Sequence, residues 1–443
     1  MKTLILFFSF FCTFKAAMAQ SLVASNFIPE NEVRQVETFL ASDDMRGRKT
    51  FSPEIEKASD FIINKFKEAG LKPFFANDFK QSFFLYSSKL ISATLKLNGN
   101  TLPDSAFTIF SGTKQIYLNN IDSFVRVDVS KDLGSAARNQ LISKYLRATS
   151  VLPANILLVV DPGQKGLIKR LKTFSLSGLV GNQKTVLIVE TAVPLTSIFL
   201  QATNEVKKQS LNNVAGILRG IEKPEEYIIF SAHYDHLGTG NNSSAMRQPI
   251  PGQDSIFNGA NDDASGTTAV IELSRYFGKK HLNKRSIIFT TFTAEEIGEY
   301  GSQYFSSHID NKKVIAMFNI EMIGTLSKWG INSAYITGFE RSNFGTLLQA
   351  NLKSSSFKFY PDPYPAQNLF YRSDNAQLAL KGVPAHTIST SKMDDERNYH
   401  TPQDEIKTLD LENMTRIIDA IALSSKQLIS GEETPDRVTI ENE

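Results

Sequence analysis

The sequence predicts an α/β fold, a three-layer sandwich in which helices cover both faces of a mixed, largely parallel central sheet. From about residue 205, apolar strand-like runs alternate with amphipathic helical segments, which is typical of parallel strands joined by helical crossovers. Residues 76–204 lack this alternation: runs such as "ILLVVD" (156–161) and "TVLIVE" (185–190) stand between polar stretches. We therefore expect a smaller subdomain there, inserted or lid-like. An N-terminal helical part over 20–75, a main domain over 205–431 and an acidic, flexible tail over 432–443 complete the predicted organisation.

The elements of the main domain can be predicted in chain order. "SPEIEKASDFIINKFKEAG" (52–70) predicts a helix with an N-cap serine, a proline at its first position and a glycine at its end. "NNVAGILRG" and "EYIIFSAHYDH" predict neighbouring strands, and a helix is expected over about 264–278. The strand "SIIFTTFTAEE", a helix near 300–308, the strands "VIAMFNIEMIG" and "GVPAHTIS" and a last helix from near Asp410 follow in that order.

The first residues predict export. "MKTLILFFSFFCTFKAAMAQ" combines an early lysine, an apolar stretch and the small-x-small sequence "AMA", which together indicate a signal peptide over 1–19. No later segment has 18 consecutive apolar residues, so we expect a soluble periplasmic or secreted protein with no membrane span after signal removal. The one cysteine, Cys12, lies inside the signal. The mature chain would therefore contain no disulfide, thiol nucleophile or cysteine-ligated metal.

The charge balance excludes one class of partner. With 48 basic and 46 acidic residues the formal net charge is +2, which gives no electrostatic reason to expect nucleic acid or an anionic membrane. The oligomeric state is not predicted by the sequence.

Histidines and carboxylates gather where the predicted strands end. In open α/β sheets, ligands bind at this carboxyl edge. Some of these residues follow strands directly, and others lie in the turns "NGANDDASG" and "NYHTPQDE" before helices. They are His233, Asp235, His236, Asp262, Glu295, Glu296, Glu321 and His400.

Each residue has a simpler explanation when it is taken singly. Asp262 and Asp263 can cap the following helix, and Glu295 and Glu296 can be exposed acids that open a helix and are favoured by its dipole. However, the chain has only six histidines, and half of them fall within these motifs. His386, inside an apolar strand, is expected to be a hydrogen-bonded core or edge histidine. The grouping favours a shared site.

Nitrogen and carboxylate donors without cysteine suit catalytic Zn²⁺. A single catalytic zinc needs only three protein ligands, so the larger set can serve two zinc ions about 3.5–4 Å apart if Asp262 bridges them. Glu295, beside the ligand Glu296, then stays free to take a proton from a zinc-bridging water and deliver it to a leaving amine. The expected ligands are His233, Asp262 and Glu321 on one metal, and Asp262, Glu296 and His400 on the other.

The motifs "AHYDHLG", "NGANDDASG", "TAEEIGEYGS", "NIEMIG" and "NYHTPQDE", in this order, resemble the cocatalytic di-zinc aminopeptidases of metallopeptidase family twenty-eight. Relatives of that family include glutamate carboxypeptidase II and the glutaminyl cyclases. The resemblance covers about 205–430, and more weakly the first helix and its lead-in "LASDDMRGRKT".

The resemblance to this family implies the zinc-dependent exopeptidase fold and the ligand set given above, with Glu295 as general acid/base. It also implies that Asp235 orients the first zinc-bound histidine and that the Tyr399 hydroxyl stabilises the oxyanion. The alternative for Tyr399 is an aromatic ring that packs beside the metal loop.

Two positions depart from the family pattern. Glu321 stands where many members have aspartate, and its longer side chain could shift the metal slightly. Asn375 replaces a histidine that is common in this stretch but is not a ligand, so we expect a changed substrate pocket and not a loss of activity.

The predicted function is that of an exported zinc exopeptidase, an aminopeptidase that acts on peptides. One alternative keeps the fold and changes the reaction: a single-zinc glutaminyl-peptide cyclase. The other is a non-catalytic ectodomain on a peptidase scaffold, although such a protein would be expected to have lost ligands that this chain retains.

Overall fold

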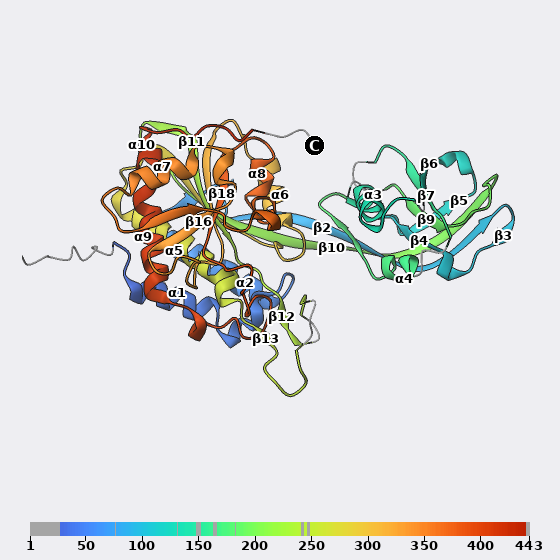
Figure 1. The fold of residues 1–443 in the computed structure, drawn as a ribbon, viewed down its shortest axis with the longest axis horizontal. Coiled ribbons are helices and arrows are strands. Elements are labelled where there is room, and N and C mark those ends of the chain that lie inside the picture. Colours follow the sequence, from blue (N-terminus) through green and yellow to red (C-terminus); the bar gives the residue numbers. More distant parts are fainter. Residues whose placement is uncertain are drawn as a thin grey trace, which may run out of the picture.

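The computed structural model describes residues 27–75, 77–130, 132–147, 152–162, 166–181, 183–240, 243–245 and 249–439. The predicted signal peptide, with Cys12, lies outside the described residues. The chain forms two lobes (Figure 1). The larger lobe contains the N-terminal helices and the chain from residue 219 onwards, and the smaller lobe contains most of the chain between β2 (Lys80–Leu97) and β10 (Ile198–Leu218).

The larger lobe is built on most of a mixed sheet with the strand order β17-β16-β18-β15-β11-β14-β10-β2-β3. The last strand, β3 (Asn100–Thr101), pairs with the end of β2 in the smaller lobe (Figure 1). Its centre is parallel: β11 (Lys223–His233) lies between β14 (Arg285–Phe292) and β15 (Val314–Ile320), and β15 pairs with β18 (Ala385–Ser389). Antiparallel pairs flank this centre, since β10 joins β14 and β16 (Ser333–Ile336) joins β18. β17 (Lys358–Pro361) forms the edge beside β16. The predicted mixed, largely parallel sheet is confirmed.

One predicted pairing is wrong. The strands around "NNVAGILRG" and "EYIIFSAHYDH", now β10 and β11, are not neighbours, because β14 lies between them. Every residue of β14 is buried. A strand of this kind needs partners on both edges and cover on both faces, so it takes a central position even though β10 and β11 follow each other closely in the chain.

Alternate residues of the central strands face different helical layers. Ile228 and Phe230 of β11 pack in the cluster that includes α1 (Glu30–Leu40), α2 (Pro53–Glu68), α5 (Ser265–Lys280), α7 (Phe344–Asn351) and α9 (Leu411–Ser424). Tyr227 and Ile229 face the opposite side, with α6 (Tyr300–Ser307) and α8 (Ala376–Ala379). This two-residue alternation with cover on both faces confirms the predicted three-layer sandwich.

Two helices begin where the sequence predicts them, and Ser52 is the N-cap as expected. The Ser52 hydroxyl accepts a hydrogen bond from the Ile55 amide at 3.3 Å, and α2 begins at Pro53. The Asp410 carboxylate accepts one from the Asn413 amide at 3.0 Å, where α9 begins. Helices α5 and α6 likewise lie where the sequence predicts them.

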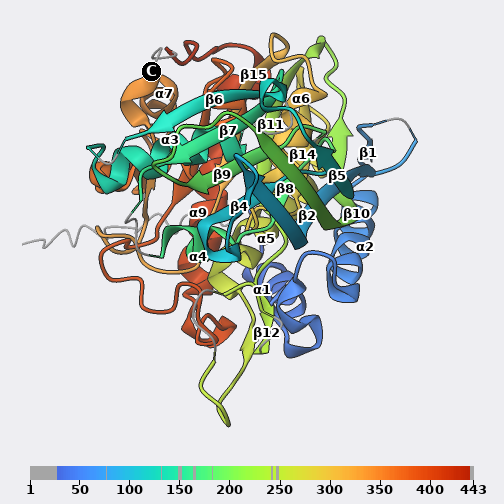
Figure 2. The same cartoon turned by 90° about the vertical axis from the view of Figure 1, so that its right-hand side faces the viewer.

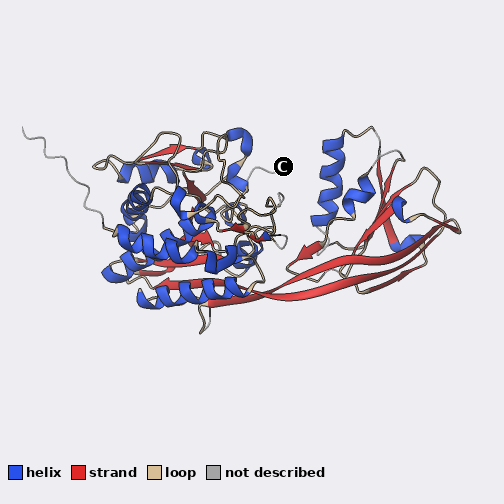
Figure 3. Cartoon of the chain, turned by 90° about the horizontal axis from the view of Figure 1, so that it is seen from below, coloured by secondary structure: helices blue, strands red, loops and turns tan. Residues whose placement is uncertain are grey.

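A long two-stranded ribbon connects the lobes. β2 and β10 pair antiparallel over nearly their whole length, and Figure 3 shows these strands running from one lobe to the other. The smaller lobe, which faces the viewer in Figure 2, has a sheet in the order β4-β9-β7-β6. Two apolar clusters belong to this lobe, so it has a core of its own. Its elements are β4 (Phe107–Phe110), β5 (Gln115–Leu118), β6 (Phe124–Val129), α3 (Ser135–Arg147), β7 (Asn155–Val160), α4 (Leu167–Leu171), β8 (Leu176–Gly178) and β9 (Val186–Glu190).

The tail does not follow the prediction of a flexible segment over its described part. The Val438 amide donates to the Gly382 carbonyl at 3.1 Å, and the Val438 side chain is buried. Arg437 donates from Nη1 to the Val314 carbonyl at 2.9 Å. An apolar side chain among the acidic ones therefore holds this segment on the larger lobe. None of the described helices is long and apolar enough to cross a membrane.

Candidate active site

The predicted residues converge at the carboxyl edge of the sheet. His233 is the last residue of β11, Glu321 follows β15 directly, and Glu295 and Glu296 lie in the turn after β14. Asp262 lies in the turn before α5. Neighbouring parallel strands end at the same edge, so residues far apart in the chain meet here.

Asp262 lies at the centre of this group. Its Oδ1 atom is 3.2 Å from His233 Nε2, and one ligand atom from each of His233, Asp262 and Glu321 lies within 4.8 Å of the others. Its other oxygen, Oδ2, is 3.2 Å from His400 Nε2, which is 3.1 Å from Glu296 Oε2. The two oxygens of one carboxylate thus face two separate sets of donors, the arrangement expected of a bridging ligand.

His236 also belongs to this cluster, although no ligand role is predicted for it from the sequence. Its Nδ1 atom is 2.7 Å from Glu296 Oε1 and 3.9 Å from Asp262 Oδ2, and these residues form a second group that could hold a metal ion. The available signal was its place three residues after His233 in "AHYDHLG". The sequence predicts one histidine ligand for each metal. It therefore gave no reason to place His236 beside Glu296 and Asp262.

The donor atoms fit divalent cations. His236 Nε2 is buried without a hydrogen-bond partner among the described residues, although unpaired buried polar atoms are costly. His233 Nε2, His236 Nδ1 and Glu296 Oε1 are also buried, and the polar atoms close to them do not form regular hydrogen bonds with them. Burial raises the pKa of Glu321 to about 7, and nearby carboxylates including Asp262 and Glu296 add to the shift. Cations at these donors would satisfy the ring nitrogens and stabilise the carboxylates in their charged form.

Glu295 lies beside the cluster with its side chain largely buried. Its Oε2 atom is 4.0 Å from His233 Nε2. Burial raises the pKa of its carboxyl well above the ordinary value, and Glu296 and Glu321 raise it further, while His233 opposes the shift. A carboxyl group with a raised pKa is suited to accept and return a proton near neutral pH.

Asp235 makes other contacts than the predicted one. His233 Nδ1 is 3.1 Å from the Asp235 main-chain carbonyl but 3.9 Å from its carboxylate Oδ1. The carboxylate accepts hydrogen bonds from the Glu295 amide at 3.1 Å and from the Thr50 hydroxyl at 2.9 Å. Asp235 therefore touches the His233 ring through its backbone and fixes the Glu295 turn through its side chain.

Three buried residues outside the predicted ligand set hold the ligand loops. The Asp404 carboxylate accepts from the Asn261 and Asp262 amides at 2.8 and 3.0 Å. Asp263 accepts hydrogen bonds from the amides of His233, Gly266 and Met322, so the helix-capping alternative is correct in part for this residue.

Arg48 is the third of these residues. It donates to four main-chain carbonyls, those of Leu40, Tyr234, Asn258 and Gly259. The segment "LASDDMRGRKT" thus holds the backbone of the loop that carries Asp262.

Tyr399 and Asn375 lie near the cluster in different ways. The Tyr399 ring stacks on the His400 ring, with centroids 3.8 Å apart, and it lines a small pocket with Glu321. Asn375 is fully buried: its amide donates to the Phe370 and Ala385 carbonyls and accepts from Thr387. It does not line this pocket. Asn375 is linked to this pocket by the hydrogen bond from Thr387, which lines it.

The sheet and the histidine–carboxylate cluster at its carboxyl edge define an α/β protein of the metallohydrolase class. Residues 213–424 match the model of peptidase family M28. This part of the chain belongs to that family, and the family predicted from the motifs is confirmed.

Similarity to individual relatives is partial in sequence and broader in fold. A probable zinc metalloprotease of Leptosphaeria maculans is 32% identical over 117 residues, 26% of this chain and 25% of that protein. Aminopeptidase YwaD of Bacillus subtilis is 24% identical over 254 residues, 52% of this chain and 48% of that protein. The chain thus spans from a quarter to about half of the length of these relatives. The solved aminopeptidase from Aneurinibacillus sp. strain AM-1 has a TM-score of 0.52 at 19% identity, covering 94% of this chain and 97% of that one, which supports the fold.

Proposed function

We propose that this protein is a zinc-dependent aminopeptidase, an exopeptidase that releases N-terminal residues from peptides. The observation that carries the proposal is the Asp262 carboxylate, whose two oxygens face His233 on one side and His400 on the other. Membership of family M28 and the similarity to a zinc metalloprotease and an aminopeptidase support the same activity.

The donors fit two zinc ions per chain. His233 and Glu321 would hold one and Glu296 and His400 the other, with Asp262 shared between them, and His236 lies against the second set. Zinc bound there would supply the positive charge that polarises the scissile carbonyl and acidifies water.

Glu295 supplies the proton transfers. It takes a proton from the attacking water and hands it to the amine that leaves, so that the same carboxyl acts first as base and then as acid. Its turn is fixed by the hydrogen bond from its own amide to Asp235. The Tyr399 hydroxyl is proposed to stabilise the oxyanion of the tetrahedral intermediate.

The preference for N-terminal cleavage is proposed from the similarity to an aminopeptidase. Glu295, Glu296, Glu321 and Asp262 lie together, but two bound Zn²⁺ ions would offset their negative charge. The net charge of the cluster therefore does not by itself select a free α-amine.

Export completes the proposal. The sequence over residues 1–19 has the composition of a signal peptide, and the mature chain would begin at Gln20 in the periplasm or outside the cell. Sequencing of the N-terminus of protein recovered from each cell fraction tests this point separately from the activity.

The decisive experiment combines metal content with end-preference. Zinc per chain is measured by elemental analysis, and hydrolysis is compared between aminoacyl-anilides and their N-acetylated forms. We expect two zinc ions and activity on the free amines alone. Glu295→Gln should keep the metal and lower turnover by about two or more orders of magnitude, whereas Glu340→Gln, whose side chain is 75% exposed, should change neither.

The other outcomes identify the alternatives. One tightly held zinc with cyclisation of peptides that begin with glutamine would indicate a glutaminyl cyclase. A zinc-loaded protein that is inert on a broad panel of peptides would indicate a binding ectodomain. An unchanged turnover in Glu295→Gln would show that the general base is another residue.

A further inference from the structure

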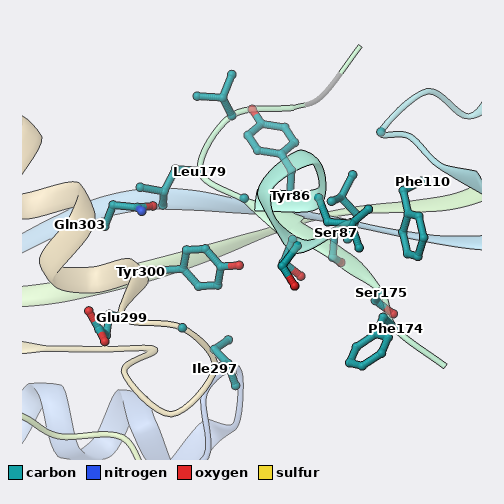
Figure 4. Close-up of a pocket in the computed structure, with 18 of the residues that line it drawn as sticks. Tyr86, Ser87, Phe110, Phe174, Ser175, Leu179, Ile297, Glu299, Tyr300 and Gln303 are labelled. Atoms are coloured by element: carbon teal, nitrogen blue, oxygen red, sulfur yellow. The ribbon is translucent and has the colours of Figure 1, made fainter. Parts of the chain in front are cut away.

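A groove of about 1390 Å³ lies between the two lobes. The larger lobe contributes α6, α8 and the turn before α6, and the smaller lobe contributes α3, α4 and the segment around β8. In Figure 4, Ile297 and Tyr300 lie on one side of this space, and Tyr86, Phe110 and Phe174 lie on the other.

Both walls present apolar side chains that would ordinarily be covered. Phe174 of the smaller lobe is 56% exposed and Leu380 of the larger lobe is 54% exposed. Ile297 and Tyr300 are only partly buried. Exposed apolar side chains that line a concave surface together mark a binding surface more often than single exposed residues do.

The groove adjoins the candidate active site. Its larger-lobe wall begins at Ile297, the residue directly after the metal-site residue Glu296. Arg372 lines both the groove and the small pocket that contains Glu321 and Tyr399. Its neighbour Ser373 donates a hydrogen bond to Glu321. A ligand in the groove would therefore reach the place where the scissile bond is expected.

Size and charge indicate the kind of ligand. The volume exceeds the roughly 300–1,000 Å³ of ordinary small-molecule pockets, so the groove has room for several residues of an extended chain. Arg170 from the smaller lobe and Arg372 from the larger lobe both line it, and neither forms an ion pair with any described residue. Guanidinium groups are well suited to bind a terminal carboxylate.

We propose that the interlobe groove holds the part of a peptide substrate that lies C-terminal to the scissile bond. This inference rests on the proposed aminopeptidase activity and extends it. The enzyme then prefers extended peptides with apolar residues after the first bond and a free C-terminal carboxylate. Dipeptides and aminoacyl-anilides leave most of the groove empty.

The test uses the full, zinc-loaded chain and peptides of two to six residues that share one N-terminal residue. We expect kcat/KM to rise about tenfold or more with length. Phe174→Ser should lower kcat/KM on the hexapeptide by about tenfold, as for the loss of one buried aromatic contact, and leave the aminoacyl-anilide unchanged. Tyr117→Ser is the matched control, because Tyr117 is a 63% exposed aromatic residue of the same lobe outside the groove.

Charge is tested separately. Arg170→Ala should remove the preference for a hexapeptide with a free carboxylate over its C-terminal amide. If the anilide is hydrolysed but kcat/KM is independent of length and Phe174→Ser has no effect, the groove proposal is overturned while the aminopeptidase stands. If neither the anilide nor any peptide is hydrolysed, the aminopeptidase proposal fails and this inference fails with it.

Discussion

Asp404 connects two of the loops that carry the proposed ligands. Asp404 is 1% exposed, and its carboxylate accepts hydrogen bonds from the Asn261 amide at 2.8 Å on one oxygen and from the Asp262 amide at 3.0 Å on the other. It lies four residues after His400, in the same loop. A change at Asp404 should therefore alter the position of the bridging carboxylate without removing any ligand.

The substitution Asp404→Asn removes one of these two bonds. An asparagine side chain retains a single acceptor oxygen, and its amide group then meets a backbone N–H that it cannot accept. A hydrogen bond to a charged group contributes about 1.5–3 kcal/mol, and about 1.4 kcal/mol corresponds to a factor of ten in an equilibrium constant. If most of this free energy serves to hold Asp262 in its ligand position, the zinc affinity should fall by about 10–100-fold. This is the range typical of residues that hold ligands in place.

Competition with a chromogenic chelator measures the zinc affinity directly, without reference to turnover. Asp410→Asn is the matched control. Its carboxylate accepts the Asn413 amide at the start of α9, and asparagine caps helices about as well as aspartate does. It should leave zinc affinity unchanged. Equal zinc affinity in Asp404→Asn and the native protein would refute the inferred link between this carboxylate and the metal loop.

Three further outcomes are expected. His400→Ala should reduce zinc from two ions to one per chain and abolish most activity, and full metal retention would remove His400 from the ligand set. The pocket beside Glu321 measures about 50 Å³, room for only a few waters, so kcat/KM should favour N-terminal alanine or serine over leucine, and an equal rate on leucine would contradict this limit. Burial lowers the pKa of His386 to about 4 from 6.5, so its contribution to stability is complete above pH 6.5 and is lost as the pH falls toward 4. In urea unfolding across this range, the native protein should lose about 3 kcal/mol of its free energy of unfolding. His386→Asn should not show this loss, since asparagine can still donate to the Thr337 carbonyl. The same pH dependence of unfolding in both proteins would contradict this assignment to His386.

Much of the larger lobe could be predicted because its determinants are local. The Ser52 and Asp410 caps, the proline at position 53 and the apolar stripe of α9 are each specified within a few residues. The strand ends could be predicted as well, because apolar runs stop where polar ligands begin. The histidine at position 386 behaves as expected, with Nδ1 2.8 Å from the Thr337 carbonyl and Nε2 2.8 Å from Ser342.

The pairing of strands could not be predicted, because it depends on distant segments. The four residues between β10 and β11 suggest a hairpin, and only the burial of β14 on both faces shows why it separates them. The roles of Asp404 and Arg48 were hidden for the same reason. Their partners are backbone atoms of remote loops. Since all residues share the same backbone groups, the sequence does not indicate which of them a side chain will contact.

The two lobes divide the proposed work between them. The proposed ligands and Glu295 all belong to the larger lobe, whereas the groove takes its walls from both. The smaller lobe is reached through the β2–β10 ribbon, whose pairing shifts register between Thr203 and Asn204. At this irregularity the Asn204 side chain donates to the Ser111 and Thr113 carbonyls, so the ribbon is fixed to the lobe that it carries. Bond cleavage therefore depends on residues of the larger lobe alone. The proposed preference for long peptides also depends on Phe174 and Arg170, whose position relative to the larger lobe is set by the ribbon.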